Sequence, residues 1–194
     1  MKKNLQLKQT AIIVGIINLF YFFVEFSFAI KVNSVSIFAD SIDFLEDASI
    51  NFIIFFASGL SLVKRARITM FLAFLMIIPG ISAIIAVWNQ VLNQIPPEPI
   101  ILSFVGAGAL LVNAGCVFLL VKLRKHSGSL AIAAFHSARN DLIANISIII
   151  TGYLTAIYFS IWPDIIVGLI ITTINTNSAI LVFKTAKKEI KFIH

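Results

Sequence analysis

Charged residues and cysteine are scarce in this sequence. Asp, Glu, Lys and Arg make up only 12% of the 194 residues, whereas hydrophobic residues make up 59% and the mean hydropathy is +1.00. A soluble domain carries about twice that charged fraction, so the composition excludes a water-soluble globular protein. The single cysteine, Cys116, lies in an apolar stretch, which excludes an internal disulfide and a cluster of thiolates. We therefore expect lipid to surround most side chains.

Six apolar segments are long enough to cross the hydrocarbon core of a bilayer, which takes about 20 helical residues. They cover residues 11–30, 34–63, 68–88, 100–121, 130–157 and 165–182. Pro96, Pro97 and Pro99 interrupt the chain between the third and fourth segments, and Pro163 with Asp164 as a capping acid begins the sixth. The sequence predicts an all-α bundle of six transmembrane helices. It predicts a single domain over residues 1–194.

The basic residues are unevenly distributed between the two ends of these spans. Thirteen of the fifteen lie at the chain termini or in the second and fourth connections: Lys2, Lys3, Lys8, Lys64, Arg65, Arg67, Lys122, Arg124, Lys125, Lys184, Lys187, Lys188 and Lys191. Because Lys and Arg accumulate in cytoplasmic loops, we expect both termini on the cytoplasmic side of the plasma (inner) membrane. Short basic tails are expected at residues 1–9 and 184–194, with no soluble C-terminal domain. The net charge of +6 thus reflects topology and does not indicate nucleic-acid binding.

Acidic side chains inside the predicted spans are the most informative feature of the sequence. Six of the nine acids lie there: Glu25, Asp40, Asp43, Glu46, Asp47 and Asp141. An ionised group at the middle of a membrane costs about 2.5–3.5 kcal/mol on insertion scales, so a functional origin is favoured for so many. We expect them to face the bundle interior, where a cation or a proton compensates their charge.

The second span gathers carboxylates on one face. At about 100° per residue, one stripe of this span holds Ser36, Asp40, Asp43, Asp47 and Asn51. Asp43 and Asp47 lie one turn apart on it. Two negative charges at one point repel each other unless a cation or a proton lies between them. The stripe therefore predicts a site for metal ions or for protons.

The fifth span supplies a third carboxylate. Ser137, Asp141 and Asn145 share one face, so oxygen ligands from two helices would make a mainly hard site, which a histidine would shift toward Zn²⁺. His136 lies about 140° around the helix from Asp141. It is either a ligand or proton carrier, which needs a local distortion of the helix, or a hydrogen-bonded interior histidine.

Other polar residues of the spans have two interpretations each. Arg139 faces away from the carboxylate of its own span, so an ion pair with Glu46 or Glu25 explains its charge, and a gating role is the alternative. Asn18 and Glu25 share one face of the first span. With Asp40 they are expected to form an accessory polar path, and interhelical packing is the alternative for the first two.

The sequence resembles the transmembrane domain of the cation diffusion facilitator (cation efflux) family. The resemblance covers essentially the whole chain and rests on three spans: Asn18 and Glu25 in the first, the run SVSIFADSIDFLED from Ser34 to Asp47 in the second, and Asn140, Asp141 and Asn145 in the fifth.

The resemblance implies a transporter that exports Zn²⁺ or a related divalent ion (Mn²⁺, Fe²⁺, Co²⁺ or Cd²⁺), commonly as a homodimer and in exchange for protons, with no bound cofactor. In such transporters two ligands four apart on the second helix and two on the fifth hold the ion. Asp43 and Asp47 match the first pair, and Asp141 matches the second member of the other. Ser137 stands where the family commonly has His or Asp. The fourth ligand is therefore open among Ser137, His136, Asn140 and Asn145.

The mechanism expected from these features is alternating access, in which a cytoplasmic metal ion enters between the second and fifth spans, displaces protons and leaves outward. A membrane phosphotransferase that uses CDP-alcohols also gathers aspartates around Mg²⁺. Its pattern, DxxDGxxAR, is not met, because Phe-Leu-Glu follows Asp43. A structural or regulatory membrane protein without transport is the second alternative.

Overall fold

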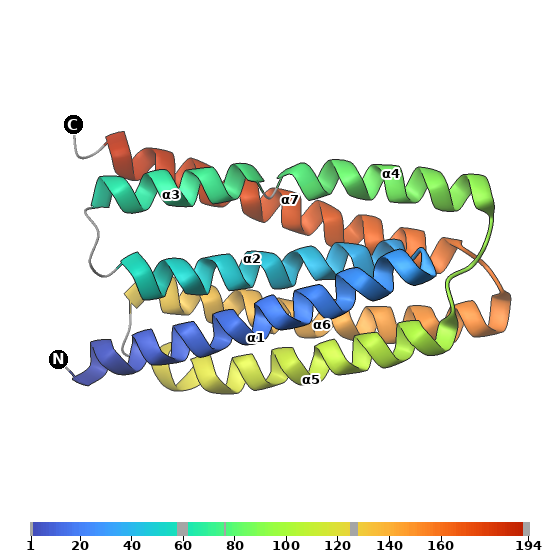
Figure 1. The fold of residues 1–194 in the computed structure, drawn as a ribbon, viewed down its shortest axis with the longest axis horizontal. Helices are drawn as coiled ribbons and strands as arrows, with labels where there is room; N and C mark the ends of the chain where they lie inside the picture. Colours follow the sequence, from blue (N-terminus) through green and yellow to red (C-terminus); the bar gives the residue numbers. More distant parts are fainter. Residues whose placement is uncertain (1, 58–61, 76, 125–127, 192–194) are drawn as a thin grey trace.

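The chain is helical along nearly its whole length. The computed structural model describes residues 2–57, 62–75, 77–124 and 128–191, and some side chains, including those of residues 122–140, lie outside the described part. The helices there are α1 (Lys2–Val32), α2 (Val35–Ala57), α3 (Leu62–Leu75), α4 (Ile77–Asn93), α5 (Pro99–Arg124), α6 (Gly128–Tyr158) and α7 (Trp162–Lys191). They run up and down one elongated bundle, with both termini at the same end (Figure 1).

The third predicted span lies along one edge of the bundle. α3 and α4 follow one another there, end to end (Figure 1), and together they cover the predicted residues 68–88 except residue 76, which lies outside the described residues. In the predicted second span, α2 is described to Ala57, residues 58–61 lie outside the described residues, and residues 62–63 belong to α3.

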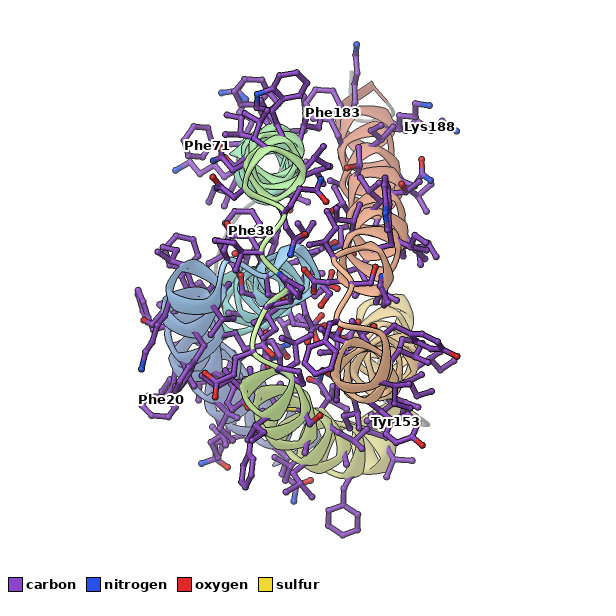
Figure 2. The ribbon with its side chains drawn as sticks, turned by 90° about the vertical axis from the view of Figure 1, so that its right-hand side faces the viewer. Phe20, Phe38, Phe71, Tyr153, Phe183 and Lys188 are labelled. Carbon is purple, nitrogen blue, oxygen red and sulfur yellow. The ribbon has the colours of Figure 1, made fainter. Side chains whose placement is uncertain are left out.

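Four helical stretches are long and apolar enough to cross a membrane by length and composition alone: residues 8–32, 99–121, 141–158 and 162–181. α2 has sufficient length but carries four acids, and α3 and α4 are each short. α2 and the pair α3–α4 complete the six passages of the bundle, so the predicted fold class is confirmed. Phe20, Phe71 and Tyr153 point away from the bundle (Figure 2) and are more than half exposed, as expected of side chains that contact lipid.

Helix α2 lies at the centre of the bundle, because it contacts each of the six other helices. α1 packs along α2, and α5 packs along α6. One apolar cluster joins α1, α2, α5, α6 and α7 through Ala29, Ile37, Ala39, Leu102, Val105, Ile148 and Ile171. The acids of α2 are therefore carried on the helix that the other helices surround.

Close approach of α7 to the beginning of α2 depends on Gly168. A Cβ atom there would lie 2.6 Å from Val35 Cγ1 and 2.7 Å from the backbone carbonyl carbon of Val35. We expect Gly168→Ala to lower the free energy of unfolding by about 1–3 kcal/mol, because backbone atoms cannot give way as a side-chain tip can. Denaturant unfolding of the purified protein in detergent measures this.

The matched control for that substitution is Gly115→Ala on α5. A Cβ atom at Gly115 would have no neighbour within 4 Å. Alanine there is expected to leave stability unchanged or to raise it by up to about 1 kcal/mol through helix propensity. Equal stability of the two alanine variants would contradict the close approach.

Asp164 links three helices at the end of the bundle away from the termini. Its carboxylate, which is fully buried, accepts hydrogen bonds from the Ser34 hydroxyl and the Val35 backbone N–H at 2.7 Å each, from the backbone N–H and hydroxyl of Ser36, and from Gln90 Nε2 at 2.9 Å. A negative charge at a helix N-terminus also interacts favourably with the helix dipole. Asp164 therefore caps α2 from the first turn of α7, where the sequence predicts an acid.

Candidate functional site

The acids of the predicted spans lie in the bundle interior and not on its outer surface. Glu25 and Asp40 are 0% exposed, Asp47 is 4% exposed and Asp141 is 9% exposed. Glu46 is also buried, and Asp43 is half-buried. Because carboxyl groups are seldom buried without compensation, this arrangement marks the centre of the bundle as a polar site.

Acids from α2 and α6 meet at this centre. The carboxyl groups of Asp47 and Asp141 are close enough to share a hydrogen bond, although they belong to helices far apart in the chain. Asp43 lies in the electrostatic field of both. The sequence predicts that the second and fifth spans bring these carboxylates together, and the structure places them in one region of the interior.

Two buried asparagines lie one turn after these acids on the same helices. Asn51 Nδ2 donates to the Asp47 carbonyl oxygen at 2.8 Å, and Asn145 Nδ2 donates to the Asp141 carbonyl oxygen at 2.7 Å. Only the amino group can donate to a carbonyl, so these bonds fix each amide orientation. The Oδ1 atom of each asparagine is buried without a hydrogen-bond partner. The sequence places Asn51 on the polar stripe but does not single it out as a ligand, although its spacing of four from Asp47 repeats that of Asn145 from Asp141.

A second pair of carboxyl groups lies between α1 and α2. Glu25 and Asp40 are within hydrogen-bonding range of each other, and none of their four oxygens has a donor among the described side chains. The sequence predicts an accessory polar path of Asn18, Glu25 and Asp40, but not that two of them meet. Asn18 lies about two helical turns before Glu25 on α1 and is fully buried. Its Oδ1 accepts a hydrogen bond from Cys116 Sγ at 3.5 Å.

Four candidates of the fifth span cannot be placed beyond their helix. The side chains of His136, Ser137, Arg139 and Asn140 lie outside the described residues, so the fourth ligand and the pairing of Arg139 with Glu46 stay predictions. Among the side chains that are described, no three of the types His, Cys, Asp and Glu form a group that could hold a metal ion. The ligand set of Asp43, Asp47 and Asp141 also stays a prediction.

A helical bundle with an apolar exterior and carboxyl groups from three helices at its centre defines a multi-span membrane protein with an acidic interior. The family model described as the cation efflux transmembrane domain matches residues 11–190. The chain therefore belongs to the cation efflux family, whose members transport metal cations and are not enzymes. Comparison with curated proteins gives no match.

Proposed function

We propose that this protein exports a divalent transition-metal ion across the plasma membrane by proton-coupled alternating access. The observation that carries the proposal is the meeting of Asp47 on α2 with Asp141 on α6 inside the bundle. Carboxyl groups from two helices change their separation whenever the helices shift, so such a site can be opened to either side in turn. Asp43 is the third ligand of the proposed site.

The donors at this site suggest which metals it takes. All described candidates, including the free amide oxygens of Asn51 and Asn145, are oxygen atoms. Oxygen ligands favour harder ions such as Mn²⁺ within the series Zn²⁺, Mn²⁺, Fe²⁺, Co²⁺ and Cd²⁺, whereas a nitrogen from His136 would favour Zn²⁺. The proposed substrate is therefore one of these ions, with the hardness of the fourth ligand deciding the preference.

The proposed orientation in the membrane rests on the basic residues. The beginnings of α1 and α3 and the ends of α5 and α7 lie at one end of the bundle (Figure 1), and these segments carry most of the basic residues. The positive-inside tendency assigns that end to the cytoplasm. A homodimer is part of the proposal as the assembly in which the transporter works.

Metal-by-metal flux into proteoliposomes with an imposed pH gradient tests the proposed function. We expect uptake of at least one ion of the series above that of protein-free vesicles, driven by an opposite proton gradient and lost when an ionophore collapses that gradient. Acidifying the side from which the metal binds should slow uptake, because protons compete with the ion for the carboxylates. Flux equal to that of protein-free vesicles for every ion would support a structural or regulatory role instead.

A further inference from the structure

Glu25 and Asp40 have no positive partner among the side chains that the structure describes. Both side chains are 0% exposed, and all four carboxyl oxygens lack a hydrogen-bond donor among the described residues. Buried polar groups are nearly always hydrogen-bonded, because an unpaired one loses its water without compensation. Within the described part of the bundle, only an added donor or positive charge, the smallest of which is a proton, can compensate the pair.

The geometry of the pair fits a proton better than a metal ion. The two carboxyl groups already lie within hydrogen-bonding range of each other, so one proton makes one of them a donor and the other its acceptor. A metal ion needs four or more ligands, whereas a shared proton needs only the two carboxyl groups of the pair.

The other described groups around the pair do not provide this proton. Tyr21 on α1 donates its hydroxyl to the Val105 carbonyl oxygen of α5 at 2.9 Å, and Asn175 on α7 donates to the Ala39 carbonyl oxygen at 3.2 Å. The other described carboxyl groups in the electrostatic field of Glu25 are Asp43 on α2 and Asp141 on α6, which are acids themselves.

We propose that Glu25 and Asp40 hold one shared proton, at a site separate from the metal ligands, and that this proton leaves when a metal ion binds. This inference rests on the proposed transport function. A divalent ion beside Asp43 and Asp141 repels a nearby proton strongly in a low-dielectric interior. The O–H bond of the pair then breaks, the proton passes to water, and a proton from the outer side reloads the pair after the metal has left.

The test combines infrared spectroscopy with a count of released protons. The variants are Glu25→Gln, Asp40→Asn and the double variant, with Glu98→Gln as the control because Glu98 is an exposed acid before α5. In metal-free protein we expect each single variant to remove the same protonated-carboxyl band, which the control retains. On addition of Mn²⁺ or Zn²⁺ in weak buffer, each variant should release about one proton fewer per bound ion than wild type.

The double variant separates a shared proton from two independent ones. One shared proton predicts that the double variant loses no more than either single variant, whereas additive losses would overturn the proposal. An unchanged band and proton count in the folded single variants would also overturn it, as would a second bound metal ion that disappears in Glu25→Gln. The infrared band needs no metal, so it still decides the inference if the wild-type protein transports no metal.

Discussion

Replacing Asp43 and Asp47 together by asparagine is expected to reduce metal flux at least 100-fold, to the level of protein-free vesicles. Asparagine preserves the size of each side chain and its helix but removes both negative charges that α2 contributes to the proposed site. Each carboxylate would pair with the metal ion of the proposed site. Removing one partner of a buried ion pair costs about 3–5 kcal/mol, and every 1.4 kcal/mol changes an equilibrium tenfold. Initial rates of metal uptake into proteoliposomes measure the effect.

The matched control for this double substitution is again Glu98→Gln. It removes an acid of the chain from an exposed position, so it is expected to transport at the wild-type rate. If the Asp43 and Asp47 double variant retained full flux while it remained folded and inserted, the carboxylates of α2 would not be the transport ligands.

Asp164→Ala is expected to cause the largest loss of stability of any single substitution proposed for this chain. The carboxylate accepts hydrogen bonds from Ser34, Val35, Ser36 and Gln90, all of which are buried. Removing it leaves these donors unpaired, and each unpaired buried donor costs about 1–3 kcal/mol. We expect a decrease of at least about 3 kcal/mol in the free energy of unfolding, measured by denaturant titration in detergent.

Asp164→Asn provides the graded comparison. Asparagine keeps one acceptor oxygen but replaces the other with an amino group that cannot accept a hydrogen bond. Its stability should therefore fall between those of the wild type and the alanine variant. A wild-type unfolding curve for Asp164→Ala would show that the cap of α2 does not stabilise the bundle.

The apolar spans could be predicted from the sequence because the membrane requires a minimum length of apolar helix. Four predicted segments, residues 11–30, 100–121, 130–157 and 165–182, lie wholly within α1, α5, α6 and α7.

The candidate site could be predicted only in part. The periodicity of α2 places Asp43 and Asp47 on one face, and the family resemblance brings Asp141 to them. Which of the remaining acids meet depends on where α1 crosses α2 and where α7 reaches α2, and one sequence does not determine crossing points. For this reason the pairing of Glu25 with Asp40 and the cap supplied by Asp164 emerge only from the structure.

The location of bound metal tests the central claim most directly. Crystals of the protein grown with Mn²⁺ would show the ion by its anomalous scattering. We predict a peak within about 2.0–2.6 Å of carboxyl oxygens of both Asp47 and Asp141, between α2 and α6. A metal ion bound elsewhere, with these two carboxyl groups not coordinating it, would contradict the proposed transport site.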